Sequence, residues 1–356
     1  MYFNEPTNFR LNPHCFLNQK RDLPSPPPGT CLTDNKLARI WTYKRTYLQQ
    51  IYINLRKGIS PGTMARTQFP FLLPTAFKPP GLHIEFTNYC DLRCTYCPSP
   101  LNWRQKGWMD ERTFSRLLSE IHTIGIKRVY MVGNGETTLH PDFAKYVREL
   151  SESKAVLSLT SNWQRIDEVI IQSILEASID LLTISVDGKD AQSYESSRLR
   201  GSFERLLNNL RKLRQSRRPN PKRLKVTIRV MLRPSQESQR KEICDFWWKF
   251  ADNVEVQRVV DETGTGEDVY GIDVIAGRFP RCSLTFKQLN VHWNGEVPLC
   301  TYATRQADDA QTAYLGNINT DTIIELWNHK LIRKYRHAHR KRIEEDMPLC
   351  NGCGGC

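Results

Sequence analysis

The chain has 356 residues, of which 39% are hydrophobic and 25% are charged, and its formal net charge is +13. This apolar content excludes a disordered chain, and no apolar run approaches the roughly 18 residues that a membrane-spanning helix needs. The positive charge suits an anionic partner such as nucleic acid, a phosphorylated substrate, an acidic peptide or a membrane surface, without choosing among them. The N-terminus lacks the basic and apolar regions of a secretory signal, so we expect a cytoplasmic protein.

Residues 1–80 differ in composition from the rest of the chain. Two proline-marked segments flank an amphipathic stretch over residues 35–56, which predicts a helix that covers the main domain or binds a partner. We therefore expect three parts: an N-terminal Pro-rich and helical extension over 1–80, a core domain over 81–270 and a smaller domain over 271–356. The length agrees with one large α/β domain and an appendage.

From residue 81 onward, short apolar runs alternate with stretches of helical periodicity. Six such units in succession predict a parallel sheet covered by helices, and six strands are fewer than a closed eight-stranded barrel contains. A partial (β/α)6 barrel is the expected fold. The predicted strands are Leu82–Phe86, Arg128–Val132, Val156–Thr160, Leu181–Val186, Leu224–Leu232 and Val254–Val259.

Start signals and apolar spacing indicate the helices between these strands. Asp110 is a candidate N-cap, and Pro141 stands where the next helix would start. An apolar stripe through Ile166, Val169 and Ile174 predicts a third helix. The basic segment 211–225 is expected to be a solvated loop, and the basic stretch 330–342 to be a helix with a charged face.

Cysteine usage points to metal or redox chemistry. The eleven cysteines are odd in number and clustered, which argues against a disulfide framework in a reducing compartment. Cys90, Cys94 and Cys97 follow the first predicted strand, so one loop can direct three thiolates to one face. Thiolates are soft ligands that suit iron–sulfur clusters or zinc, and a fourth local ligand is missing.

The pattern Cys90-x3-Cys94-x-Tyr96-Cys97 resembles the signature of the radical S-adenosylmethionine superfamily. The resemblance implies a 4Fe-4S cluster held by these three cysteines, with one iron left open to chelate the amino and carboxylate groups of S-adenosylmethionine. It also implies reductive cleavage to a 5′-deoxyadenosyl radical that abstracts a substrate hydrogen. The fold of that family, a partial (β/α)6 barrel, agrees with the strand count.

Further segments at predicted strand ends resemble the family's cofactor-binding motifs, although helix caps and surface ion pairs would use the same residue types. The Gly133–Glu136 segment resembles the family's Gly-Gly-Glu-Pro motif, in which glycines allow close backbone approach and a carboxylate suits the methionyl ammonium. Glu85 is another candidate near the site, whereas His140 is interpreted as a turn residue. The residues expected to contact S-adenosylmethionine are Tyr96, Gly133, Gly135, Glu136, Asn162, Ser185 and Arg198.

A second cysteine group occupies the end of the chain. Cys282, followed by Gly295-x4-Cys300, resembles the opening of the SPASM/Twitch extension, which holds auxiliary iron–sulfur clusters. Five cysteines here, rather than seven, imply the shorter Twitch form with one auxiliary 4Fe-4S cluster. Its implied ligands are Cys282, Cys300, Cys350 and Cys353, while Cys356 is spare: it could replace Cys353 or donate a hydrogen atom. A structural zinc site is the alternative.

The resemblance implies an oxidoreductase, and dehydrogenation of a sugar or aminocyclitol-like substrate is our first hypothesis, because an auxiliary cluster can accept an electron. Epimerisation using Cys356, or modification of a ribosomal peptide, are alternatives. The electron donor would be a flavodoxin or ferredoxin. A hypothesis of another class is a basic, metal-stabilised nucleic-acid-binding protein, but no nucleic-acid motif accompanies the basic stretches. The substrate itself is not encoded in any motif.

Overall fold

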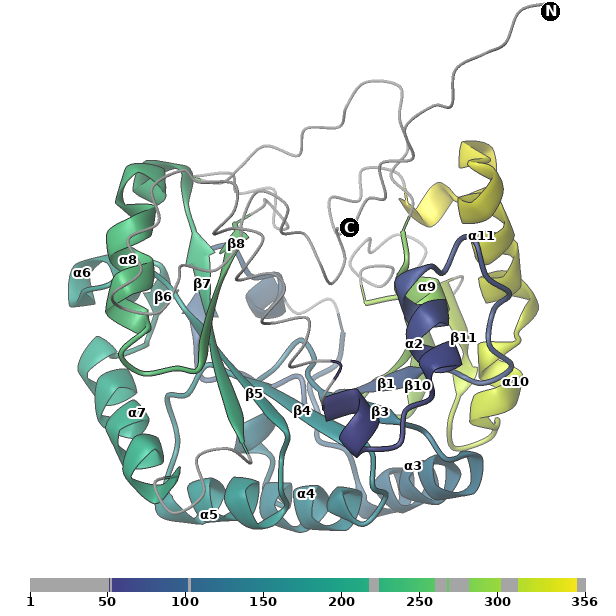
Figure 1. The fold of residues 1–356 in the computed structure, drawn as a ribbon, viewed down its shortest axis with the longest axis horizontal. Helices are drawn as coiled ribbons and strands as arrows, with labels where there is room; N and C mark the ends of the chain where they lie inside the picture. Colours follow the sequence, from purple (N-terminus) through teal and green to yellow (C-terminus); the bar gives the residue numbers. More distant parts are fainter. Residues whose placement is uncertain are drawn as a thin grey trace, which may run out of the picture.

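The computed structural model describes residues 51, 53–101, 104–217, 224–259, 268, 282–301 and 313–350. Its centre is a curved seven-stranded sheet with the strand order β8-β7-β5-β4-β3-β1-β9, in which all neighbours are parallel. Figure 1 shows helices wrapped around the convex side of this sheet. The strands are β1 Gly81–Ile84, β3 Arg128–Met131, β4 Val156–Ser161, β5 Leu181–Val186, β7 Lys225–Leu232, β8 Asn253–Arg258 and β9 Gln288–Val291.

The sheet is an arc rather than a closed ring. Within the described ranges, β8 and β9 each pair on one side only and form its two edges. The prediction of a partial TIM-like barrel is therefore confirmed, and so are its six strands to within two residues. Helices between the strands are α3 Glu111–Ile124, α4 Phe143–Ser151, α5 Glu168–Glu176, α6 Ala191–Glu195, α7 Phe203–Arg217 and α8 Arg240–Trp247.

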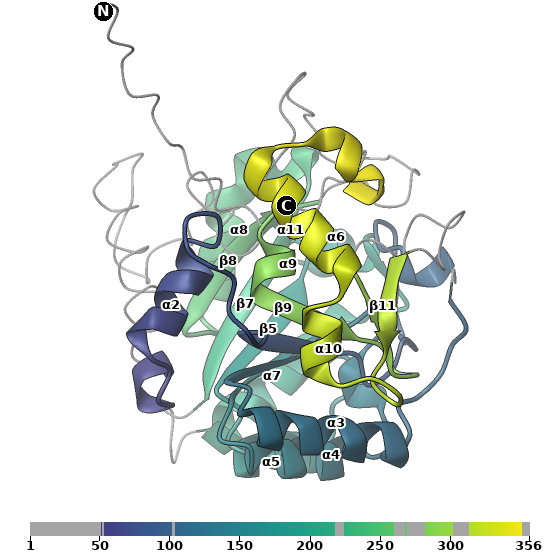
Figure 2. The ribbon, with the colours of Figure 1, turned by 90° about the vertical axis from the view of Figure 1, so that its right-hand side faces the viewer.

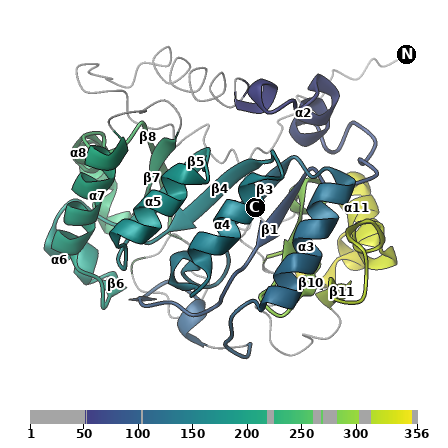
Figure 3. The same cartoon turned by 90° about the horizontal axis from the view of Figure 1, so that it is seen from below.

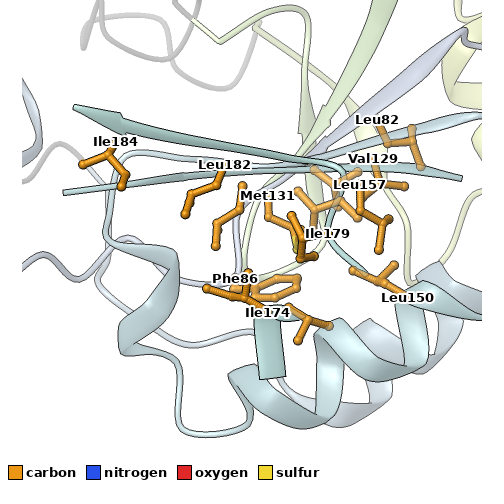
Figure 4. Packing of buried hydrophobic residues seen from close by; sticks show 14 of the residues in the cluster. Leu82, Phe86, Val129, Met131, Leu150, Leu157, Ile174, Ile179, Leu182 and Ile184 are labelled. Carbon is orange, nitrogen blue, oxygen red and sulfur yellow. The ribbon is translucent and has the colours of Figure 1, made fainter. Parts of the chain in front are cut away.

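The two faces of the sheet differ in chemistry. Residues that point toward the helices are apolar and buried, as Figure 4 shows for Leu82, Met131 and Leu157 above Leu150 and Ile174. Burial of each such side chain contributes about 1.5–3 kcal/mol. The alternate residues form the inner face, are mostly polar, and apart from buried Glu85 are only partly buried. This inner face includes His83, Glu85, Tyr130, Ser158, Thr160, Thr183, Ser185, Thr227, Arg229 and Glu255.

Local signals fix where the helices begin and end. Asp110 caps α3 as predicted, its side chain accepting from the Thr113 backbone N–H at 2.7 Å, and the helix ends at Gly125 with φ of 68°. Three expectations need correction. Helix α4 begins two residues after Pro141, Val169 is 65% exposed because the core-facing stripe of α5 passes beside it, and α7 continues to Arg217, so the first half of the basic segment 211–225 is helical.

The sequence-based interpretation missed the seventh strand. The segment assigned to the C-terminal domain sends β9 into the main sheet, where Leu289 pairs with Leu82. After it come the hairpin of β10 Glu296–Pro298 and β11 Tyr314–Asn317, then α10 Ile323–Trp327 and α11 Lys330–Lys341. Figure 2 shows α10 and α11 stacked beside this end of the sheet, with the short α9 Leu284–Lys287 between them and the strands.

Residues 53–80 pack on the core domain. Ile53 and Ile59 contact Val156 at the start of β4, and Arg56 pairs with buried Asp180, just before β5, at 2.6 Å. Figure 3 places this segment and its helix α2 Pro61–Gln68 along one side of the sheet, away from α4 and α5. Most of the predicted helix 35–56 lies outside the described residues. No described helix combines the length and apolarity needed to cross a membrane.

Candidate active site

The loop that carries the first three cysteines is tied to a distant segment. Cys94 lies in β2, Arg93–Cys94, which pairs antiparallel with β6, Arg198–Leu199, so that Cys94 stands opposite Arg198. Next to it, the Thr95 backbone N–H donates to the Ser197 carbonyl at 3.0 Å. The three cysteine residues are each partly exposed. A loop of few residues is thereby held in one conformation at the carboxyl ends of the strands, where parallel sheets place their active sites.

A buried charge network lies under this loop. Asp187, which is fully buried, accepts from Tyr96 Oη at 3.0 Å and from Arg198 Nε at 2.8 Å, and Ser197 Oγ donates to its other oxygen. Arg198 Nη2 also donates to Tyr96 Oη at 2.9 Å. Two nitrogens of Arg198 therefore hold the loop in place. Its predicted pairing with the methionyl carboxylate, and the predicted cofactor contact of Tyr96, remain predictions.

Glu136 is a buried carboxylate beside the cysteine loop. Its backbone N–H donates to the Tyr89 carbonyl at 2.7 Å, and its side chain accepts from the Asn162 backbone N–H at 2.6 Å and from Thr138 Oγ1 at 2.7 Å. These donors to the carboxylate are neutral, and burial raises the pKa of Glu136. A cation placed here would be stabilised, which fits the ammonium group of S-adenosylmethionine.

The two glycines of the Gly133–Glu136 segment are required by packing. A Cβ on Gly135 would lie 2.5 Å from the Thr87 and Tyr89 carbonyl oxygens, and one on Gly133 would lie 2.4 Å from Glu85 Cγ. Both positions therefore let the loop after β3 lie against the chain that leaves β1. Close approach to a ligand was the predicted reason for these glycines, and the structure adds a second one.

Asn162 connects the cysteine loop to Glu136. Its Nδ2 lies 2.7 Å from Asp91 Oδ1 and 3.9 Å from Cys90 Sγ, while its backbone N–H donates to Glu136. Ser185 stands apart from these contacts, on the inner face of β5 opposite Arg229 of β7. The structure therefore brings Asn162 together with the predicted ligands and places Ser185 on the neighbouring sheet surface.

Sequence reasoning missed two arginines at the site. Arg233 directly follows β7 and donates to Thr95 Oγ1 at 2.6 Å and to Ser197 Oγ at 3.0 Å. The sequence signal that could have identified Arg233 as a site residue was its position directly after a predicted strand. Arg104 donates to both oxygens of Glu85 at 2.9 and 2.8 Å. Burial alone would raise the pKa of Glu85, but nearby His292 and Arg104 hold it below its usual value. His140 is a buried turn residue, as predicted: its Nδ1 accepts from the Asp142 backbone N–H at 3.0 Å.

The described cysteines of the second group converge on α11. The Cys282 backbone N–H donates to His339 Nδ1 at 3.4 Å, and Cys350 Sγ lies 3.9 Å from His339 Nε2. Burial, followed by the nearby Cys350 and Cys300 sulfurs, raises the pKa of Tyr335. Cys282 and Cys350 thus both lie against His339 of this helix, although they are far apart in sequence. Cys353 and Cys356 lie outside the described residues.

The donor chemistry fits iron–sulfur clusters. Burial raises the pKa of Cys94 to about 12, and burial followed by Glu136 raises the pKa of Cys90 well above its usual range. These thiols therefore remain protonated at neutral pH unless iron takes the place of the proton. Three soft ligands on one loop, next to a buried carboxylate without a cationic donor, suit a cluster that also binds an amino acid group.

Comparisons with known proteins agree. The model of the radical SAM superfamily matches residues 84–246, and that of the SPASM iron–sulfur cluster-binding domain matches residues 282–354. A tungsten-containing aldehyde ferredoxin oxidoreductase cofactor-modifying protein of Pyrococcus furiosus is 31% identical over 30% of this chain and 30% of its own length. PqqA peptide cyclase of Methylorubrum extorquens is 30% identical over 37% of this chain and 34% of its length. The chain thus spans about a third of the curated relatives it matches.

Solved structures share the fold at low sequence identity. BtrN in complex with AdoMet and 2-DOIA has a TM-score of 0.52 and 16% identity, covering 77% of this chain and 92% of that one. Streptococcus suis SuiB bound to precursor peptide SuiA has a TM-score of 0.58 and 15% identity, covering 91% and 73%. This chain therefore belongs to the radical SAM superfamily, carries a SPASM-type iron–sulfur domain, and uses 4Fe-4S clusters and S-adenosylmethionine as its cofactors.

Proposed function

We propose that this radical SAM enzyme dehydrogenates a hydroxyl-rich substrate, of the sugar or aminocyclitol class, that binds against the inner face of the sheet. The observation that carries the proposal is the polar character of that face. Hydroxyl groups of Tyr130, Thr183 and Thr227 alternate with fully buried apolar residues, and Arg229 pairs with Glu255 at 3.2 Å. Such partly buried donors and acceptors suit a ligand that forms many hydrogen bonds.

The residues at the carboxyl ends of the strands have separate tasks in this proposal. Cys90, Cys94 and Cys97 would hold the first cluster, and Glu136 would bind the methionyl ammonium. S-adenosylmethionine bound there supplies a 5′-deoxyadenosyl radical. Asn162 would orient the cysteine loop and Glu136 relative to one another. Its side chain donates to Asp91 in that loop, and its backbone N–H donates to Glu136. The substrate then lies against the inner face within reach of the same strand ends.

Dehydrogenation needs two electrons and two protons to leave the substrate. Abstraction of a hydrogen atom from a carbinol carbon removes the first electron and proton. Loss of the hydroxyl proton to water and of a second electron leaves a carbonyl group, and the auxiliary cluster would accept that electron. The structure supports this division of labour because β9 joins the auxiliary segment to β1. Trp293, just after β9, donates from Nε1 to the Gln105 carbonyl at 3.3 Å.

Peptide modification is the second candidate, and the comparisons favour it. PqqA peptide cyclase is a relative over part of the chain, SuiB was solved with a precursor peptide, and anSMEcpe with bound Cp18Cys peptide has a TM-score of 0.56. A peptide backbone also presents many hydrogen-bonding groups to a polar surface. Epimerisation would depend on Cys356, which the structure does not describe, and a flavodoxin or ferredoxin donor stays a proposal.

The deciding experiment uses the full chain after anaerobic reconstitution. About eight irons per chain would correspond to two 4Fe-4S clusters. S-adenosylmethionine and dithionite are added with aminocyclitols deuterated at the carbinol carbons, or with peptides deuterated at Cα. We expect deuterium in 5′-deoxyadenosine, and a ketone product, from the cyclitol set. Deuterium transfer from peptides alone would overturn the dehydrogenase proposal in favour of peptide modification. Absence of S-adenosylmethionine cleavage with full iron content would overturn both.

A further inference from the structure

His339 lies between two cysteines of the auxiliary group. It is 1% exposed on α11, which crosses the Cys282 and Cys350 segments. Its two ring nitrogens face different cysteines: Nδ1 lies 3.4 Å from the Cys282 backbone nitrogen, and Nε2 lies 3.9 Å from Cys350 Sγ. Because the ring is in contact with both, its orientation is linked to the position of both segments.

The first of these contacts fixes the tautomer. A backbone N–H can only donate, so Nδ1 of His339 must be the acceptor and must lack a proton. The one ring proton is therefore on Nε2, which faces Cys350 Sγ. A neutral imidazole with this tautomer is a hydrogen-bond donor to that sulfur.

We propose that His339 is a positioning residue of the auxiliary cluster, whose Nε2–H donates to the Cys350 thiolate and raises the cluster's reduction potential. A hydrogen bond to a ligand sulfur stabilises the reduced cluster, which carries more negative charge, over the oxidised one. The inference rests on the proposed function, since it takes Cys282 and Cys350 to be cluster ligands. It deepens that function, because a higher potential makes the cluster a better acceptor of the substrate's second electron.

The two hydrogen bonds can be separated by substitution. His339→Asn keeps an amide near the position of Nδ1, so it can accept from the Cys282 N–H, but it is too short to reach Cys350. His339→Gln places its amide near Nε2 and can still donate to the sulfur. His339→Phe removes both hydrogen bonds but keeps an aromatic ring at this position. His337→Phe is the matched control, since His337 is exposed two residues earlier on the same helix.

The potential is measured on the full chain carrying Cys90→Ala, Cys94→Ala and Cys97→Ala, which leaves the auxiliary cluster as the only one expected. Redox titration followed by electron paramagnetic resonance reports the midpoint. His339→Phe and His339→Asn should lower the equilibrium constant for reduction about tenfold, which is about 59 mV for one electron. In His339→Gln the equilibrium constant for reduction should stay within about threefold of the parent's value by the same conversion. In His337→Phe it should equal the parent's value. Proton ENDOR should lose one exchangeable coupling in the Phe and Asn variants.

Three results would overturn the inference. If the midpoint potential of His339→Phe is unchanged at full iron content, no hydrogen bond from His339 to Cys350 sets the potential. If His339→Gln loses iron, His339 is a ligand or a structural residue. A triple-cysteine variant without iron would show that the auxiliary ligand set is wrong. If the potential shifts as expected but no substrate is oxidised, only the dehydrogenase proposal fails, so the two failures are distinguishable.

Discussion

The two cysteine groups of this protein are assembled in different ways. The first comes from eight consecutive residues, and distant segments hold that loop in place through Asp187, Arg198 and the β2–β6 pairing. In the second, Cys282 and Cys350 lie far apart in sequence, and only the tertiary fold brings both to His339 of α11. Local spacing therefore encodes the first group, while the second depends on how the C-terminal segments pack.

The largest expected effect comes from the locally encoded group. Replacing Cys94 with Ala should remove one of three cluster ligands and lower S-adenosylmethionine cleavage by about 10³-fold or more, equivalent to about 4 kcal/mol in the barrier. The measurement is 5′-deoxyadenosine formation together with iron content. Cys244→Ala is the control, because Cys244 is a buried packing residue of α8. Equal loss in both variants would contradict a ligand role for Cys94.

Loss of a ligand from the second cysteine group should leave the first group functional. Cys282→Ala should lower the iron content by about four per chain, the content of one 4Fe-4S cluster, and abolish substrate oxidation. Cleavage of S-adenosylmethionine should continue, because the first loop does not contain this residue. Iron analysis and 5′-deoxyadenosine assays on one sample check this. If S-adenosylmethionine cleavage disappears as well, the two cysteine groups form one cooperative unit and are not assembled independently.

The network under the first loop should matter for stability. Asp187→Asn leaves the buried guanidinium of Arg198 without its counter-charge, and removal of one partner from a buried ion pair costs about 3–5 kcal/mol. Urea unfolding of the cluster-free protein measures the loss. Asp190→Asn is the matched control: it makes the same change at an exposed N-cap of α6, where Asn serves nearly as well. Similar losses in both variants would refute a special role for Asp187.

Glu136 is expected to affect binding and stability with opposite signs. Burial raises the pKa of Glu136, so the charged form is disfavoured in the folded protein and Glu136→Gln should stabilise the cluster-free chain slightly. The same change removes the partner of the methionyl ammonium and should weaken S-adenosylmethionine binding about 10–100-fold, as for a charge-assisted hydrogen bond. Calorimetry measures the change in S-adenosylmethionine affinity, and urea unfolding measures the change in stability. Unchanged affinity would place the ammonium elsewhere.

The sequence predicted the strands well because apolar runs in parallel sheets are strong signals. It missed β9, because this four-residue strand lies in the segment assigned to the C-terminal domain and because its pairing with β1 is a tertiary event. It placed Cys90 and Glu136 near one another by motif position, and Asn162 lies between them in the structure. It could not reveal that Arg233 reaches Thr95, or that His339 separates two cysteines, since those contacts join segments with no common pattern.

The contact between Arg56 and Asp180 has a consequence for shortening the chain. Asp180 is 1% exposed, accepts from the Leu157 backbone N–H at 3.1 Å, and has Arg56 and Lys57 as its cations. A truncation at residue 81, the boundary that composition suggests, would delete both cations and uncover Val156. A minimal catalytic fragment should therefore begin before Ile53, so that the carboxylate between β4 and β5 keeps its charge partners.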